Sequence, residues 1–243
     1  MRVDRPPCPP RVEAEPRVPI FAGRMGATSS QIFEALRTGK PVSDEEFDRV
    51  FPPWARKPSR LHWTPLETAR RAAELLAWRE GARILDVGSG VGKFCLVGAL
   101  TTDGVFVGVE QREQFVKVAR AVARRGRVPR CLFLHGNLLE LDWRGFDGLY
   151  LYNPFAENLP GHEPIDETVK RSVRKYRRYV RFIEELLAEA PAELRVVTYH
   201  GFGGEMPVGW SEAAYEWSGS GPLVLWRKTS APRGHGVEEL HRQ

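Results

Sequence analysis

The sequence predicts an α/β fold built around a seven-stranded, mostly parallel sheet with helices on both faces. Two patterns lead to this prediction: residues 27–80 have the apolar spacing of helices, and residues 82–228 alternate short apolar strands with helical segments. A third observation is the glycine-rich turn GSGVG, which joins the first strand to the next helix. We therefore expect an N-terminal helical extension followed by one sheet-based core.

The composition changes along the chain and predicts four segments. Residues 1–22 combine many prolines with charges, and residues 229–243 have no apolar period, so both are expected to be flexible tails. Between them we expect a helical extension over residues 23–80 and a core domain over residues 81–228. A chain of 243 residues is long enough to bury one core of this kind.

Seven short runs rich in β-branched and aromatic residues are predicted to be strands. They span residues 83–87, 105–110, 131–135, 148–152, 195–199, 213–217 and 223–227. The segment SGSGP separates the last two runs and is typical of a tight turn. We therefore expect an antiparallel hairpin at the end of the sheet.

The clearest helix signal lies at residues 65–78. Thr64 is predicted to be its N-cap, Pro65 stands in the first turn, where a missing N–H is tolerated, and Glu67 completes a capping box. The buried stripe of this helix is expected to be Leu66, Ala69, Ala73 and Leu76.

A longer helix is predicted over residues 166–190. Arginines 171, 174, 178 and 181 share one of its faces. Such a face either binds phosphate or is simply solvated. The segment at residues 200–207 stands where a helix usually follows the fifth strand, and is either a mobile lid or a plain connecting loop.

The net charge of +5 and the pI of about 9.3 favour an acidic partner such as a nucleic acid. Only seven of the 36 basic residues are lysines, however, and this skew toward arginine also fits a GC-rich genome. The net charge alone therefore does not identify a partner.

Cysteine usage and apolar patterning indicate a cytoplasmic protein. Cys8, Cys95 and Cys131 are not spaced as zinc ligands, so we expect a reducing compartment and no structural metal. No apolar stretch is long enough for a membrane span, and the proline-rich start does not resemble a signal peptide. We expect no membrane partner.

The segment ARILDVGSGVGKF, residues 82–94, carries the strongest chemical signal. Glycines at 88, 90 and 92 allow positive φ angles and close approach of a ligand, and the helix that follows offers free N–H groups. Dinucleotide-binding enzymes use the spacing G-x-G-x-x-G at this place, whereas the spacing here is G-x-G-x-G. Asp86 precedes the first glycine by two residues, where a carboxylate can organise a ligand ammonium group.

The segment ILDVGSGVG resembles the first motif of the class I S-adenosylmethionine-dependent methyltransferases. The resemblance implies a Rossmann-like sheet, S-adenosyl-L-methionine as the cofactor, and a cofactor site that includes Asp86, Gly88, Ser89, Gly90 and Gly92. The stretch DVGSGVG is also similar to the loop of the histone-lysine methyltransferases that lack a SET domain.

Two further cofactor-binding elements are implied by the same resemblance. Glu110 ends the second strand, where a carboxylate can bind both ribose hydroxyls, and Gln111 follows it. An acid at this place is also typical of dinucleotide enzymes. FLHGNLLEL resembles the third motif, with Asn137 and Leu138 at the adenine; Asn137 is equally well explained as a turn former.

The catalytic residues are expected in the segment FDGLYLYNPFAEN. Asn153, Pro154 and Phe155 follow the fourth strand and resemble the fourth motif of amino-methyltransferases, with one of the two usual prolines missing. Asn153 would hold the acceptor nitrogen, and Phe155 or Tyr152 would stack on it. A proline-terminated strand with a buried aromatic is the alternative.

The segment LHWTP, residues 61–65, resembles the aromatic-x-T-P element that closes over the methionine end of the cofactor. This places Thr64 among the cofactor-binding residues. The alternative is a helix cap in which Trp63 is a hydrophobic staple.

The sequence thus predicts a methyltransferase that uses S-adenosylmethionine and acts on an amine-type acceptor. A protein or nucleic-acid acceptor is favoured over a small molecule. The alternatives are a small-molecule methyltransferase, a non-catalytic subunit that binds the cofactor or RNA, and, disfavoured by the glycine spacing, a nicotinamide oxidoreductase.

Overall fold

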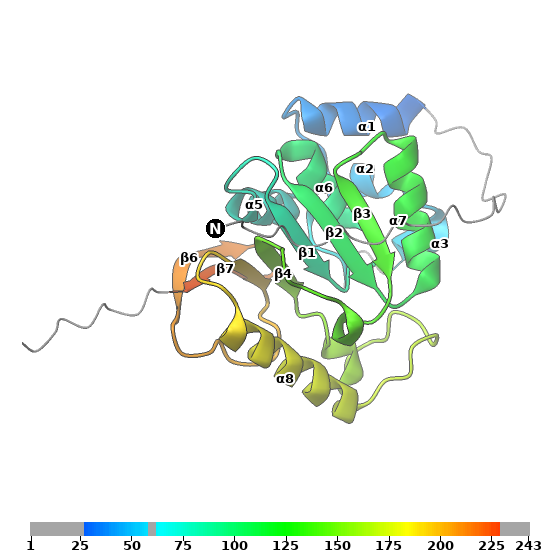
Figure 1. Ribbon diagram of the computed structural model, residues 1–243. Coiled ribbons are helices and arrows are strands. Elements are labelled where there is room, and N and C mark those ends of the chain that lie inside the picture. Colours follow the sequence, from blue (N-terminus) through cyan, green and yellow to red (C-terminus); the bar gives the residue numbers. More distant parts are fainter. Residues whose placement is uncertain (1–26, 58–61, 229–243) are drawn as a thin grey trace, which may run out of the picture.

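The computed structural model describes residues 27–57 and 62–228 (Figure 1). Both predicted tails and Cys8 lie outside these residues. The helices are α1 (Ala27–Arg37), α2 (Asp44–Asp48), α3 (Pro53–Arg56), α5 (Leu66–Leu76), α6 (Lys93–Thr101), α7 (Glu113–Arg125) and α8 (Val173–Glu189), with two 3-10 turns, η1 (Leu138–Glu140) and η2 (Ala156–Asn158). The strands are β1 (Arg83–Val87), β2 (Val105–Glu110), β3 (Cys131–His135), β4 (Gly148–Tyr152), β5 (Arg195–Tyr199), β6 (Trp210–Ser218) and β7 (Gly221–Lys228).

The sheet has the strand order β3-β2-β1-β4-β5-β7-β6. Strands β1 to β5 pair in parallel, while β7 runs antiparallel to both β5 and β6. The predicted parallel sheet and terminal hairpin are therefore confirmed. The strand order reverses between β1 and β4, and such a switch point is where open α/β sheets bind ligands, beyond the carboxyl ends of the strands.

Two apolar cores lie on opposite faces of the sheet, because side chains alternate along each strand. Ile84 of β1 packs in the core beneath α1, α2, α5, α6 and α7. Leu85 points the other way, into a core that α8 covers with Ile183 and Leu187. Helices on both faces are thus confirmed, and Figure 1 shows α8 set apart from the helices of the first face.

The start of α5 differs from the prediction. Its N-cap is Pro65, and no side chain of the cap bonds to the helix. Thr64 instead shares a hydrogen bond of 2.9 Å with the Tyr150 hydroxyl, and the Leu66 N–H donates to the Asp44 carboxylate at 2.8 Å. The predicted Thr64 cap is wrong because the Asp44 carboxylate, from α2, binds the Leu66 N–H instead. The predicted stripe of Leu66, Ala69, Ala73 and Leu76 is fully buried.

Helix α8 begins later than predicted, at Val173 rather than at residue 166. The Asp166 carboxylate accepts bonds from the N–H and hydroxyl of Thr168, which hold a turn in place of a helix. Ser172 then caps α8 by accepting from the Lys175 N–H at 3.1 Å. Val169 and Arg171 therefore do not belong to α8.

The N-terminal helices are tied to the glycine-rich loop by a buried ion pair. Lys93, the first residue of α6, is only 3% exposed, and its Nζ lies 2.6 Å from Asp44 and 2.8 Å from Asp48 on α2. A buried ammonium group needs such partners. This contact explains why the helical extension packs directly behind the loop.

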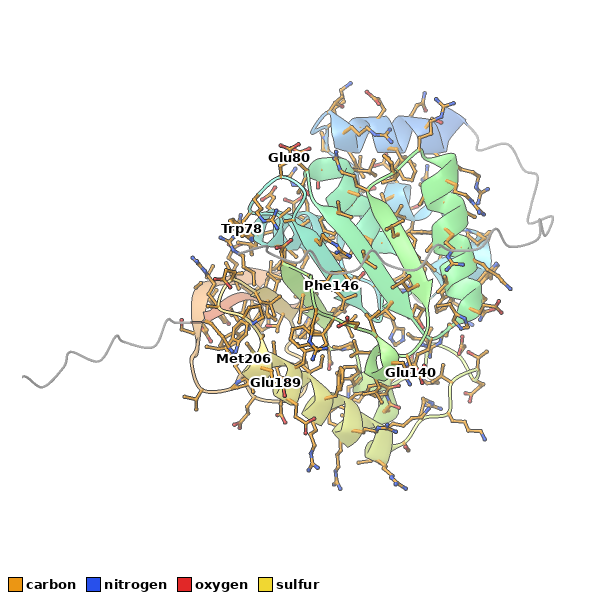
Figure 2. The ribbon with its side chains drawn as sticks, in the orientation of Figure 1. Trp78, Glu80, Glu140, Phe146, Glu189 and Met206 are labelled. Carbon is orange, nitrogen blue, oxygen red and sulfur yellow. The ribbon has the colours of Figure 1, made fainter. Side chains whose placement is uncertain are left out.

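Residues 200–209 connect β5 to β6 without a helix, as expected. Phe202 is buried, Gly203 accepts a bond from the Tyr176 hydroxyl at 3.1 Å, and the Glu205 N–H donates to Glu184. The loop is thus packed on α8, and Figure 2 labels Met206 from the loop and Glu189 from the helix. Across residues 27–57 and 62–228, no helix has the length and apolar character to cross a membrane.

Candidate functional site

A pocket of about 640 Å³ lies beyond the carboxyl ends of β1, β2, β4 and β5. Seven residues predicted from sequence line it, namely Gly88, Glu110, Gln111, Leu138, Asn153, Pro154 and Phe155. The other predicted residues surround the pocket without lining it: Thr64, Asp86, Ser89, Gly90, Gly92 and Asn137. The predicted site residues therefore fall into two groups, those that line the pocket and those that do not.

The glycine loop requires its glycines. Gly88, Gly90 and Gly92 have φ angles of +76°, +52° and +81°, which L side chains rarely adopt. A Cβ on Gly92 would also lie 2.3 Å from the Phe133 ring, whereas one on Gly88 would lie 3.6 Å from Pro154. The loop therefore passes close to the segment that follows β4.

Glu110 holds this loop in place. Its carboxylate accepts from the Gly90 N–H at 3.0 Å and from the Arg112 N–H at 2.9 Å, and its side chain is 5% exposed. Burial raises the pKa of Glu110, and the two backbone bonds and the Arg112 charge lower it. A carboxylate can accept about four hydrogen bonds, so Glu110 keeps capacity for a ligand.

Arg112 is the centre of a buried ion network at the edge of the pocket. Its guanidinium lies 2.6 Å from Glu157, 3.1 Å from Asp166 and 3.5 Å from Glu110. Glu157 and Asp166 both belong to the segment between β4 and α8. Arg112 therefore links the carboxylate at the end of β2 to the segment that covers the pocket.

Asp86 is buried behind the loop, where the Cys95 thiol lies 3.4 Å from its carboxylate. Burial raises its pKa to about 7, the Cys95 bond lowers it, and the nearby Glu110 raises it. Among the described residues Asp86 has no cation as a partner, so a ligand cation nearby would favour its ionised form.

Trp63 and Ser89 carry the two buried side-chain polar atoms that lack a partner among the described residues. Trp63 is 7% exposed, and a Cβ built on Gly90 would lie 3.4 Å from its Nε1. Its ring packs edge-on against Phe51 at 5.5 Å between centroids. A buried N–H without a partner is costly, which makes Trp63 a candidate donor to a ligand beside the loop.

Asn137 caps η1 through a bond of 3.1 Å from the Leu139 N–H to its side-chain oxygen. The turn-forming interpretation of this residue therefore describes its geometry. Leu138 and Gly136, its neighbours, line the pocket, whereas Asn137 does not.

Asn153 follows β4 in the left-handed conformation, with a φ angle of +35°. Its N–H donates to the Gly201 carbonyl at 3.0 Å, which joins the ends of β4 and β5. Asn153 lines the pocket, and its carboxamide has no hydrogen-bond partner in the described part of the chain. Asparagine tolerates this conformation better than most residues, and its side chain is available to a ligand.

Phe155 has a different neighbour from the one expected. Its ring stacks on Tyr179 of α8, with centroids 5.0 Å apart, and the two share an apolar cluster with Leu138. The Tyr179 hydroxyl donates to the Gln111 side chain at 3.4 Å. Phe155 thus lines the same part of the pocket as Gln111 and Leu138, and Leu138 was predicted at the adenine.

The lining residues that the sequence reasoning missed include His62, Arg112, Tyr179 and His200. His200 follows β5 with a φ angle of +55°, and its Nε2 lies 3.0 Å from the Ser220 hydroxyl. Burial lowers the pKa of both histidines. A signal was present only for His200, because a polar residue directly after a parallel strand lies at the ligand-binding edge.

The fold and this site define an α/β protein that binds a small ligand at the switch point of a Rossmann-like sheet. Residues 79–158 match the family model described as a methyltransferase domain. A comparison with curated proteins gave no match.

Two solved structures share the fold. One is an RNA methyltransferase from Salinibacter ruber in complex with S-adenosyl-L-homocysteine. The TM-score is 0.51 and the sequence identity is 23%, and the match covers 70% of this chain and 96% of that one. The other is TrmN from Thermus thermophilus, with a TM-score of 0.51 and 20% identity; 75% of this chain covers 53% of its length. Residues 79–158 therefore carry a methyltransferase domain, and the sheet has the Rossmann-like fold of class I S-adenosylmethionine-dependent methyltransferases.

Proposed function

We propose that this enzyme transfers the methyl group of S-adenosylmethionine to a nitrogen atom on a macromolecule, in the pocket described above. The observation that carries the proposal is the free Asn153 carboxamide, which lines the same pocket as the Glu110 carboxylate. A side-chain oxygen beyond β4 can accept a hydrogen bond from the N–H group of the molecule to be methylated. This bond orients the lone pair of that nitrogen.

The residues present fit the cofactor. The pocket volume of about 640 Å³ falls in the range of small-molecule sites. Glu110 has acceptor capacity for the ribose hydroxyls, and Leu138, Phe155 and Tyr179 offer an apolar wall for adenine. At the methionine end, the Trp63 N–H and the α6 N-terminus suit a carboxylate, and Asp86 suits an ammonium group.

When bound, the cofactor supplies an activated sulfonium methyl group. The protein's part is to align the acceptor, exclude water and accept a proton. Asn153 positions the nitrogen, and Tyr152, half-buried beside Tyr199, shields it from water. His200 has a lowered pKa, so its imidazole is neutral at pH 7 and can accept the proton that the nitrogen loses.

A macromolecular acceptor is favoured by the basic net charge of the chain. One structural neighbour with the same fold is an RNA methyltransferase. The test is incubation of the enzyme with cell extract and methyl-labelled S-adenosylmethionine, followed by protease or nuclease digestion. Label that resists both enzymes and passes a small-molecule filter would contradict the proposal.

Replacement of Glu110 by alanine is expected to weaken cofactor binding by about 1–3 kcal/mol, the usual cost of losing hydrogen bonds to a charged group. Calorimetry with S-adenosylmethionine and S-adenosylhomocysteine measures the effect. The wild type should bind both ligands but not NAD, because the loop spacing does not suit a pyrophosphate. An unchanged dissociation constant in a folded variant would remove Glu110 from the site.

The affinity for S-adenosylmethionine is expected to depend on pH through Asp86. Its pKa of about 7 in the free protein is expected to fall when a ligand ammonium group binds beside it, so binding releases a proton. Affinity should therefore rise with pH up to about 7 and level off above it, by at most tenfold per pH unit.

The matched ligand for this measurement is 5′-methylthioadenosine, which lacks the amino-acid part. Any pH dependence shared by the two ligands reports on Glu110, and the additional dependence reports on Asp86. The Asp86→Asn variant should lose only the additional part. If it keeps that part, another group is responsible.

A further inference from the structure

One face of α8 presents a row of arginines to solvent. Arg174, Arg178 and Arg181 are four and three residues apart, so they share one side of the helix. Arg177 lies next to Arg178, and all four arginines are exposed. With Leu139 and other residues of α8 they line a groove of about 640 Å³. Figure 2 shows nitrogen-tipped side chains extending from the outer side of α8, away from the sheet.

These arginines have no carboxylate partners among the described residues, whereas several other surface arginines do. Arg70, Arg71, Arg79, Arg130 and Arg144 each form an ion pair with an acid. None of the four arginines on α8 has an ion pair or a side-chain hydrogen bond within the described residues. Glu185 is the one acid among the residues that line the groove, so the groove carries a strongly positive charge.

The basic groove adjoins the candidate active site at two places. On α8, Arg178 lines the groove and the next residue, Tyr179, lines the pocket. At η1, Leu139 lines the groove and Leu138 lines the pocket. A long ligand bound along the groove can therefore extend into the pocket, where the methyl group is transferred.

We propose that this groove binds the phosphate backbone of a nucleic-acid strand whose base enters the pocket. Guanidinium groups bind phosphate in bidentate geometry. Four of them that are not paired with carboxylates provide the positive charge that a polyanion needs. Phe182, partly buried in the groove, offers a surface for an unpaired base. The inference rests on the proposed methyltransferase activity and names its acceptor class.

The test uses the triple variant Arg174→Gln, Arg178→Gln, Arg181→Gln of the full chain. The matched control, Arg124→Gln, Arg125→Gln, Arg227→Gln, removes the same charge from exposed positions outside the groove. Binding of a fluorescent single-stranded RNA and of the same sequence as DNA is measured across a salt series, and cofactor affinity is measured separately. Comparing the two strands separates RNA from DNA as the source of the phosphate.

We expect the triple variant to lose affinity by tenfold or more and its salt dependence to fall by about 2 in slope, because three contacts contribute about 0.7 each. The control should bind like the wild type, and both variants should bind the cofactor normally. Equal losses in both variants, or none in the triple variant, would overturn the proposal.

Two further outcomes separate this inference from the proposed activity. Strand binding that depends on the groove, in an enzyme that methylates no acceptor in extract, supports the groove while the proposed activity fails. Label that enters protein alone, with polyglutamate binding the groove in place of RNA and DNA, overturns the groove proposal but leaves methyl transfer standing.

Discussion

Replacement of Asn153 by alanine is expected to lower the single-turnover rate of methyl transfer by about ten- to a thousand-fold, with cofactor affinity nearly unchanged. The reason is position: Asn153 follows β4 and lines the pocket, whereas Glu110 ends β2 and Asp86 lies within β1. Loss of an interaction made mainly in the transition state lowers the rate and not the affinity.

The backbone of Asn153 calls for a second variant, because alanine is strained at its φ angle of +35°. Asn153→Gly removes the carboxamide without this strain, and Asn153→Asp keeps an acceptor oxygen. We expect the glycine variant to be as slow as the alanine variant and the aspartate variant to retain more activity. Wild-type rates in the glycine variant would show that Asn153 is only a strand terminator.

Replacement of Arg112 by glutamine is expected to destabilise the fold by about 3–5 kcal/mol, the usual cost of removing one partner of a buried ion pair. The guanidinium is 2% exposed and contacts Glu110, Glu157 and Asp166. Loss of the guanidinium leaves the carboxylates of Glu110, Glu157 and Asp166 without this cation. Cofactor affinity should fall as well, because Glu110 then lacks the side chain beside it.

Denaturant unfolding measures the change in stability, and a double-mutant cycle with Glu157→Gln identifies its origin. The double variant should be more stable than Arg112→Gln alone, because it no longer buries that unpaired carboxylate. The matched control is Arg144→Gln, whose ion pair with Asp142 is exposed and should contribute little. A loss below about 1 kcal/mol for Arg112→Gln would rule out a structural role for the network.

The two results would separate the chemistry of the pocket from its construction. Asn153 is placed to act on the acceptor, while Arg112 holds the segment between β4 and α8 against the end of β2. The same segment leads into α8, so the Arg112 network also supports the helix that carries the basic groove.

The local pattern of the sequence was sufficient for the sheet. Five of the seven strands begin and end at the predicted residues, and the buried stripe of α5 was found from its spacing. These features depend on side-chain alternation and on neighbours within a few residues, which the sequence displays directly. The positions of the glycine loop after β1 and of Glu110 at the end of β2 were predictable for the same reason, because both are fixed by the ends of strands.

The partners of individual side chains were decided only by the tertiary structure. The cap of α5 comes from Asp44, 22 residues before Leu66, and the partners of Arg112 include Glu157, 45 residues away. Phe155 packs on Tyr179 of α8, and His200 reaches the pocket because β4 and β5 are adjacent. Such contacts depend on which surfaces meet when distant segments pack, and no local period or spacing in the sequence records that choice.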